Sequence, residues 1–189
     1  MLLDNGGVRF SEDLVNWGRE RVIFPPGSSH QRFCQTSTDH LWAVYSQASL
    51  DEELYTSGDV LIGFYVRGGK RWKRLVDIWV TSTVDGKRWT DPVRIATGGE
   101  PTEVWAFPVA ADQVAVAALY NRRFLKWHAG SRPEGFRAVN GPVRALRRAE
   151  VGFFVQDERV ICTRTVRGRG QENSVLQLSS TALYESLSQ

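Results

Sequence analysis

A short turn between two β-rich runs constrains the fold of this chain most. Residues 77–83 and 93–95 are rich in the β-branched and aromatic residues typical of strands. Between them, Asp85 can accept hydrogen bonds from turn amides, Gly86 can adopt a positive φ angle, and Trp89 can fold back onto the strands. The segment therefore predicts two strands joined by a turn that its own side chains stabilise. A simple Asp-Gly hairpin is the alternative.

A second copy of the pattern lies near the start of the chain. Ser11, Asp13 and Trp17 repeat the spacing of the hydroxyl, carboxylate and indole side chains, and apolar runs flank them. Leu14 stands where the other copy has glycine. A turn that recurs between strands predicts a repeated β structure. Two further segments retain only part of the pattern: 131–136 and 180–187.

Three tight polar turns divide pairs of apolar runs in the rest of the chain. They are centred on residues 39–40, 112–113 and 157–158. Each hairpin is later followed by one of the turns described above, so the repeating unit is strand, tight turn, strand, loop, strand, turn, strand. This order predicts an all-β fold, a β-propeller of four-stranded antiparallel blades with about three and a half to four blades present.

The length of the chain limits how many blades can form. At the ~40 to 50 residues of such a repeat, a chain of 189 residues holds fewer blades than a large ring needs. We expect residues 1–189 to form a single domain, either a fragment of a larger ring or a small ring closed by the half blades at its two ends. Open strand edges would favour self-association.

The turn pattern resembles the Asp-box of the sialidase-like β-propellers, the neuraminidase superfamily with Asp-box (BNR) repeats. In that family the Asp-box joins the third and fourth strands of a blade, and the ring has six blades. The resemblance implies that this chain is incomplete relative to such a ring. The residues that match the structural Asp-box positions are Asp13, Trp17, Asp85, Gly86 and Trp89.

The resemblance also implies a binding site for a carboxylated sugar. In sialidases an arginine opens the first strand of an early blade, and the acid/base aspartate follows the second strand. Arg32 and Asp51 match these two positions. Cys34 replaces a proline of the family, and Gln47 stands where the family has its second arginine.

The next blade repeats this arrangement. Glu103 opens its first strand and matches the catalytic glutamate, and Arg122 follows its second strand as a further substrate-binding arginine. Arg164, at the end of a later strand, is a candidate third arginine. A slip in register would substitute Glu100 and Arg123, and ordinary charged residues at strand ends are the alternative. We expect the residues at these strand ends to converge on one rim of the propeller.

The family's chemistry explains why these residue types are needed. Guanidinium groups bind the planar carboxylate of a sialic acid bidentately, a tyrosine paired with a glutamate is the nucleophile, and an aspartate is the acid/base. No tyrosine of this sequence matches the nucleophile. The missing nucleophile and Gln47 favour binding over turnover.

Two functions are therefore open. The first is a sialidase-like glycoside hydrolase of the exo-sialidase type, or a fragment of one, that recognises a carboxylated glycan. The second is a non-catalytic propeller that binds glycan or protein on an aromatic, basic rim. That rim would lie in the insertion around Gly68-Gly69, which has the form of an additional hairpin and could equally shield a sheet edge. Its candidate residues are Tyr65, Arg67, Trp72 and Lys73.

Composition argues against several other classes. The net charge of +3 and the pI near 9.1 come from scattered arginines, which disfavours a nucleic-acid partner. No run approaches the ~18 to 20 apolar residues of a membrane span, and the start of the chain lacks the features of a signal peptide, so we expect a soluble chain in an unknown compartment. Cys34 and Cys162 are expected to be free buried thiols. The three histidines show no ligand spacing, so we expect neither metal nor cofactor.

Overall fold

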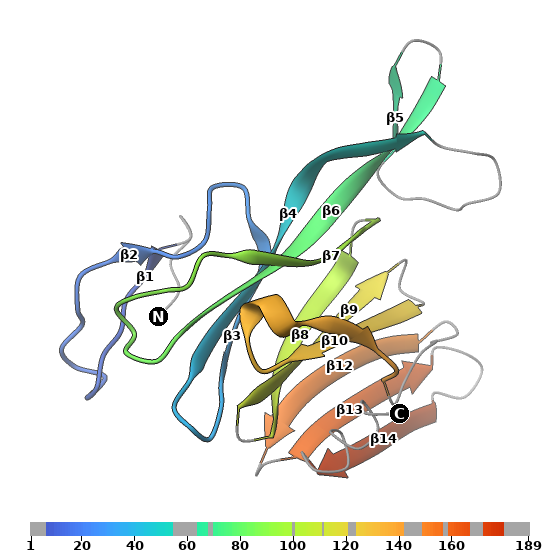
Figure 1. The fold of residues 1–189 in the computed structure, drawn as a ribbon. Coiled ribbons are helices and arrows are strands. Elements are labelled where there is room, and N and C mark those ends of the chain that lie inside the picture. The colour runs from blue at the N-terminus through green and yellow to red at the C-terminus, as the bar shows by residue number, and fades with distance from the viewer. Residues whose placement is uncertain are drawn as a thin grey trace.

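The computed structural model describes residues 7–54, 64–67, 70–99, 101–110, 112–120, 124–141, 149–156, 159–166 and 172–179. This part of the chain consists of strands in antiparallel sheets and one 3-10 turn, Pro133–Gly135 (Figure 1). The predicted all-β class is confirmed. None of these residues forms a helix long and apolar enough to cross a membrane.

The largest sheet is built on two long central strands. Each has 14 residues, and together they extend beyond their neighbours as a ribbon (Figure 1). The order is β3-β4-β6-β5, with β7 also paired to β6. The strands are β3 (Ser29–Gln35), β4 (Leu41–Leu54), β5 (Phe64–Arg67), β6 (Lys70–Thr83) and β7 (Val93–Gly98).

Three smaller sheets complete the described structure. The second sheet has the order β11-β10-β9-β8, the third has β12-β13-β14, and β1 pairs with β2 alone. The three predicted hairpins, β3-β4, β8-β9 and β12-β13, all pair antiparallel. The strands are β1 (Gly7–Val8), β2 (Arg21–Val22), β8 (Pro101–Ala110), β9 (Gln113–Tyr120), β10 (Phe124–Gly130), β11 (Arg137–Val139), β12 (Ala149–Gln156), β13 (Arg159–Val166) and β14 (Glu172–Ser179).

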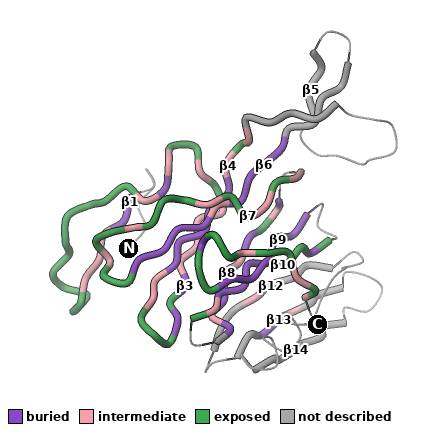
Figure 2. Tube along the Cα trace, in the orientation of Figure 1, coloured by how far each residue is buried: buried purple, intermediate pink, exposed green. Residues whose placement is uncertain are grey.

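The sheets pack face to face, because successive side chains of a strand point to opposite faces. In β4, Ala43 and Tyr45 pack with Val8 and Phe24 near the β1-β2 pair. Trp42 and Val44 point the other way and pack with β8 and β9 of the second sheet. The next layer joins the second and third sheets, where Phe107 and Trp127 pack against Phe153. Figure 2 shows buried residues along β4, β6, β8 and β9. The described strands form successive layers and no closed ring.

The turn after β6 has the predicted geometry. Asp85 Oδ1 accepts hydrogen bonds from the backbone N–H groups of Lys87 at 2.7 Å and Arg88 at 2.8 Å, and from the Thr83 hydroxyl at 3.0 Å. Gly86 has a φ of +64°. The hydrogen bonds from the Arg88 and Lys87 amides lower the pKa of Asp85 to about 2. The turn is thus stabilised by a carboxylate that is ionised at neutral pH.

The turn between β1 and β2 has the same geometry. Asp13 Oδ1 accepts from the backbone N–H of Val15 at 2.9 Å and of Asn16 at 2.7 Å, and from the Ser11 hydroxyl at 3.0 Å. Leu14 takes the position of the glycine with a φ of +61°. The amides of Asn16 and Val15 lower the pKa of Asp13 strongly. The carboxylate and hydroxyl therefore specify this turn even without glycine.

The two tryptophans of these turns differ in their surroundings. Trp89 is partly buried, packing with Tyr45 and its neighbours and lying with its ring centroid 6.2 Å from that of Phe33. Trp17 is 39% exposed and, unlike Trp89, is not among the residues that pack in the core around Tyr45. Among the described strands, β1 and β2 pair only with each other.

Candidate functional site

Arg32 on β3 and Glu103 on β8 meet across the junction of the first two sheets. Arg32 Nη2 lies 3.5 Å from Glu103 Oε2. The two side chains are 40% and 49% exposed. Two residues that are remote in sequence are therefore brought together at an accessible position.

The backbone of β3 helps to orient the arginine. Pairing between β3 and β4 shifts register between Ser29 and Arg32, which marks a bulge. Arg32 Nη1 donates to the carbonyl of its own neighbour Gln31 at 2.9 Å. One end of the guanidinium is thus held by the backbone and the other by Glu103.

His30 lies in the same bulge and links three strands. Its Nδ1 is 2.9 Å from Ser46 Oγ on β4, and its Nε2 is 3.3 Å from the Thr102 carbonyl on β8. Thr102 in turn donates its hydroxyl to the Leu119 carbonyl on β9. Nothing in the sequence indicates this role, because the three histidines show no spacing pattern that singles out His30.

Asp51, the predicted acid/base residue, does not lie where the sequence predicted. Asp51 was expected on a loop, but it lies within β4, where pairing with β6 is irregular between Ala48 and Glu52. The ribbon of β4 and β6 continues through the segment that we interpreted as a loop. Asp51 is therefore a strand residue, and its side chain is outside the described part.

The remaining arginines are not brought to the site by any described contact. Arg122, with its register alternatives Glu100 and Arg123, lies outside the described residues. Arg164 lies on β13 opposite Val151, and the structure places its backbone only.

Gln47, which replaces an arginine of the family, faces the opposite side of the first sheet. Its Nε2 donates to the Pro26 carbonyl at 3.5 Å. It pairs directly with Asp77 on β6, so both side chains lie on the face that carries Tyr45. The sheet thus separates Gln47 from the Arg32–Glu103 pair.

Asp77 is a buried carboxylate that the sequence did not single out as functional. It is 4% exposed, and its Oδ2 lies 3.6 Å from Arg94 Nη1. Its Oδ1 is buried and has no hydrogen-bond partner among the described residues. Asp77 pairs with Gln47, so it lies on the face of the sheet opposite the Arg32–Glu103 pair.

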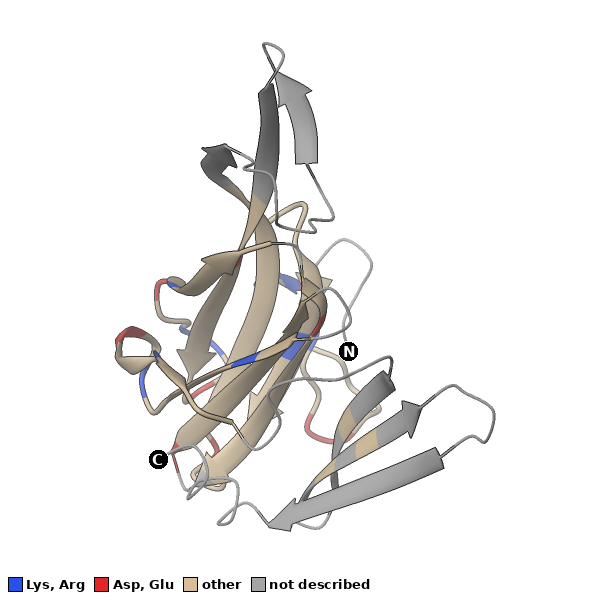
Figure 3. Ribbon diagram, turned by 90° about the vertical axis from the view of Figure 1, so that its right-hand side faces the viewer, with Lys and Arg blue, Asp and Glu red and all other residues tan. Residues whose placement is uncertain are grey.

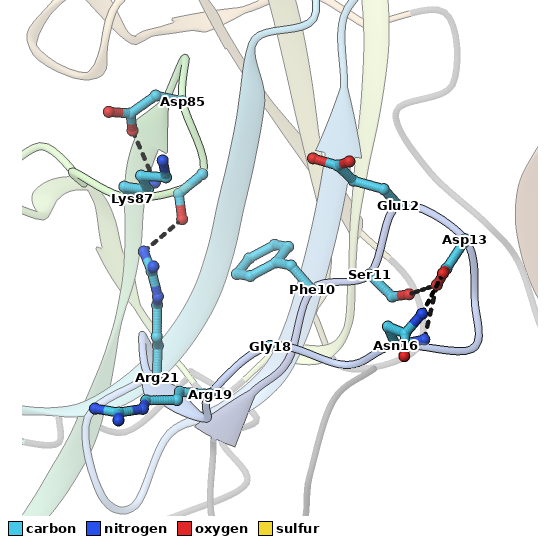
Figure 4. Close-up of a pocket in the computed structure, with 11 residues that line it drawn as sticks. Phe10, Ser11, Glu12, Asp13, Asn16, Gly18, Arg19, Arg21, Asp85 and Lys87 are labelled. Carbon is cyan, nitrogen blue, oxygen red and sulfur yellow. Dashed lines mark hydrogen bonds between the residues drawn. The ribbon is translucent and has the colours of Figure 1, made fainter.

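A separate hollow of about 570 Å³ lies between the two turns (Figure 4). Arg21 bridges the turns by donating to the Gly86 carbonyl at 2.8 Å. The lining carries three cations and three carboxylates, and two of these carboxylates are those of the turns. Such a balanced lining selects no ligand charge. The charged residues are Glu12, Asp13, Asp85, Arg19, Arg21 and Lys87.

The charged side chains of the described residues are dispersed over the molecule. Figure 3 shows basic and acidic residues in several separate places. Cys34 is free and buried, and burial raises the pKa of its thiol to about 12. Within the described residues, no three histidine, cysteine or acidic side chains are grouped to hold a metal.

Comparisons with known proteins identify sialidases among the solved structures. No protein-family model and no curated protein matches the chain. The chain is similar to the Hadza microbial sialidase Hz136, with a TM-score of 0.48 and 15% identity, over 93% of this chain and 39% of that one. It is also similar to the Trypanosoma rangeli sialidase in complex with the inhibitor DANA, with a TM-score of 0.44 and 14% identity, over 94% of this chain and 32% of that one. These similarities bear at most on the fold and assign no activity.

Proposed function

We propose that this chain is part of a sialidase-like propeller that binds a carboxylated glycan at the junction of β3 and β8. The Arg32 guanidinium carries the proposal, because it is accessible, oriented by the Gln31 carbonyl and paired with Glu103 at 3.5 Å. A planar guanidinium fork matches a carboxylate bidentately. The site thus presents the group that a sialic acid requires.

The ion pair does not block such a ligand. Exposed ion pairs contribute about 0 to 1 kcal/mol, so an incoming carboxylate can displace Glu103 from Arg32 at small expense. The released Glu103 carboxylate then accepts hydrogen bonds from sugar hydroxyls. One residue binds the acid and the other binds the polyol.

The two turns support the propeller part of the proposal. We propose that the turns at Asp13 and Asp85 are Asp-boxes and that the stacked sheets are successive blades. Each turn joins two antiparallel neighbours through the same set of carboxylate and hydroxyl hydrogen bonds. Each is closed by an equivalent backbone bond of 2.9 Å, from Gly18 to Phe10 and from Thr90 to Ser82.

Binding without turnover is the form of the proposal that Tyr45 and Tyr120, the two tyrosines with described side chains, favour. Burial raises the pKa of Tyr120 to about 12, and its hydroxyl has no hydrogen-bond partner among the described residues. Burial also raises the pKa of Tyr45. A phenol nucleophile needs an adjacent base and access to the substrate, and neither tyrosine has both. If hydrolysis occurs, Asp51 and Glu103 are the proposed catalytic residues, with Arg122 and Arg164 as further binding residues.

A second candidate surface is the ribbon of β5 and β6. The backbone register pairs Tyr65 with Trp72, Arg67 with Lys70, and Phe64 with Lys73. The aromatic, basic rim of the non-catalytic alternative, with Tyr65, Arg67, Trp72 and Lys73, therefore lies on one two-stranded pairing.

Titration of N-acetylneuraminic acid into labelled protein, followed by NMR, tests the proposed function. We expect millimolar binding with shifts centred on β3 and β8, and at least about tenfold weaker binding by Arg32→Ala, since a charged hydrogen bond contributes ~1.5 to 3 kcal/mol. Arg137→Ala, at an exposed position of β11, is the matched control. A fluorogenic sialoside should be turned over little or not at all.

Two results would contradict the proposal. Absence of binding at millimolar ligand, or equal binding by wild type and Arg32→Ala, would remove the carboxylate site. Robust sialoside hydrolysis would show that the chain is a hydrolase.

A further inference from the structure

His30 lies where the first two sheets join at the candidate site. It precedes Arg32 by two residues, and its partner Thr102 immediately precedes Glu103. Its φ of +51° is uncommon for a residue other than glycine. The β-bulge therefore holds an unfavourable backbone conformation that places this ring between β4 and β8.

The hydrogen bonds around His30 can be counted against the available protons. The ring contacts Ser46 Oγ through Nδ1 and the Thr102 carbonyl through Nε2. The same Ser46 hydroxyl donates to the Ser29 carbonyl at 3.1 Å. Both carbonyls can only accept, so these three hydrogen bonds need three protons.

A neutral ring cannot supply them. Neutral imidazole carries one N–H and the serine hydroxyl carries one proton, so only two of the three hydrogen bonds form. If Nε2 is protonated, Ser46 must turn from Ser29 toward Nδ1. If Nδ1 is protonated, Nε2 faces the Thr102 carbonyl as a second acceptor. The doubly protonated ring makes all three hydrogen bonds.

We propose that His30 is a positioning residue of the candidate site, joining β3 to β8 through Ser46 and Thr102 most firmly when its ring carries two protons. This inference rests on the proposed function and names its regulation. The tightened junction fixes the distance between Arg32 and Glu103. The added positive charge beside Arg32 also favours an anionic sugar, so binding is stronger in mildly acidic solution.

Few other charges act on this ring. Among the described side chains of β3, β4, β8 and β9, only Arg32 and Glu103 carry charges at neutral pH. The β4 residue that contacts the ring is the uncharged Ser46. Tyr120, at the end of β9, stays neutral because burial raises its pKa. A pH effect at this junction therefore comes from the protonation of His30, which adds a positive charge near the charges of Arg32 and Glu103.

The pH response of His30 can be distinguished from effects of the other two histidines. Burial lowers the pKa of His128 to about 4, so this ring is neutral between pH 5.5 and 7.5. His40 lies beside Trp42, with ring centroids 5.0 Å apart, away from the site. His40→Asn is therefore the matched control for His30→Asn. Asparagine suits position 30 because it tolerates a positive φ.

Thermal unfolding at pH 5.5 and 7.5 gives a readout that needs no ligand. The third hydrogen bond requires the doubly protonated ring, which acid favours, and is lost when the ring carries one proton. Relative to His30→Asn, wild type should gain about 2 to 4 °C in melting temperature on going from pH 7.5 to 5.5. His40→Asn should retain that gain. An identical pH response of wild type and His30→Asn would overturn the inference.

Ring NMR of the wild type gives a second readout, independent of whether the variant folds. At pH 5.5, both nitrogens of His30 should show attached protons in hydrogen bonds. A singly protonated ring at this pH would overturn the inference.

Titration of N-acetylneuraminic acid at the same two pH values separates this inference from the proposed function. Wild type should bind at least about threefold more tightly at pH 5.5, and His30→Asn should not. Binding with the same pH response in both proteins would overturn the positioning role and leave the proposed function standing. No binding at either pH, together with the expected melting behaviour, would remove the proposed function and leave the His30 junction intact.

Discussion

Leu14 and Gly86 occupy the same position in two turns that are remote in sequence, with φ angles of +61° and +64°. The hydrogen bonds of Asp13 and Asp85 impose this conformation in both turns. A leucine at positive φ is unfavourable by about 1 to 2 kcal/mol relative to the right-handed region. The carboxylate is therefore the dominant determinant of the turn. Glycine is favoured there because it adopts the required positive φ without strain.

The two positions should respond oppositely to substitution. Leu14 is 76% exposed, so Leu14→Gly removes strain with little loss of packing and should stabilise the protein by about 0.5 kcal/mol. Gly86→Ala should destabilise it by about 1 kcal/mol. Chemical denaturation measures both, with exposed Val15→Ala as a control that should change little. Destabilisation by Leu14→Gly would show that this side chain has a packing role.

The two turn tryptophans should differ in their contribution to stability. Trp89→Ala should lower the free energy of unfolding by about 3 kcal/mol, because the indole packs against Phe33 and the core around Tyr45. Trp17→Ala should lower it by less, about 1 kcal/mol, because Trp17 is 39% exposed and lies outside the core around Tyr45. Equal losses in urea unfolding would mean that Trp17 is covered in solution by a surface absent from the described structure.

Acid should weaken the turn at Asp85 in a defined pH range. The turn amides lower the pKa of Asp85 to about 2, so its ionised form stabilises the fold above pH ~4, where an unfolded aspartate is also ionised. This stabilisation is lost as pH falls from ~4 through 2. The difference in melting temperature between wild type and Asp85→Asn should be largest near pH 6 and should vanish near pH 2. A difference that stays constant over this range would show that the charge of Asp85 is unimportant.

The Arg32–Glu103 pair should contribute little to folding. Both side chains are more than one-third exposed, so a double-mutant cycle of Arg32→Ala and Glu103→Ala should give a coupling energy below about 1 kcal/mol. The measurement is the free energy of unfolding of the four proteins. A coupling above about 2 kcal/mol would assign the pair to the scaffold and leave no displaceable partner for a ligand.

Local chemistry explains which parts of the structure the sequence could predict. Asp85 and Gly86 specify their turn through bonds to adjacent residues, and the Asp13 turn follows from the same spacing. The hairpins were equally local, since polar pairs such as Asp39-His40 separate runs of apolar residues. The meeting of Arg32 and Glu103 followed from the repeat, because equivalent strand starts converge when sheets stack.

Features that depend on distant surfaces could not be predicted in this way. Trp17 and Trp89 match the same position of the turn pattern, but only Trp89 packs in the core around Tyr45, and their neighbours in sequence do not reveal this difference. Asp51 was expected to follow the second strand, as the resemblance implied, but cross-strand pairing with β6 extends β4 through it. The role of His30 depends on a bulge and on a carbonyl of β8, neither of which has a sequence signature.

The central claim is that Arg32 binds the carboxylate of a sugar. The most direct measurement compares the affinities of N-acetylneuraminic acid and its methyl ester for wild type and for Arg32→Gln, by NMR at fixed pH and salt. If Arg32 is the carboxylate ligand, wild type binds the acid at least about tenfold more tightly than the ester, and Arg32→Gln binds both equally weakly. The account is contradicted if wild type does not distinguish acid from ester, or if Arg32→Gln retains the full preference for the acid.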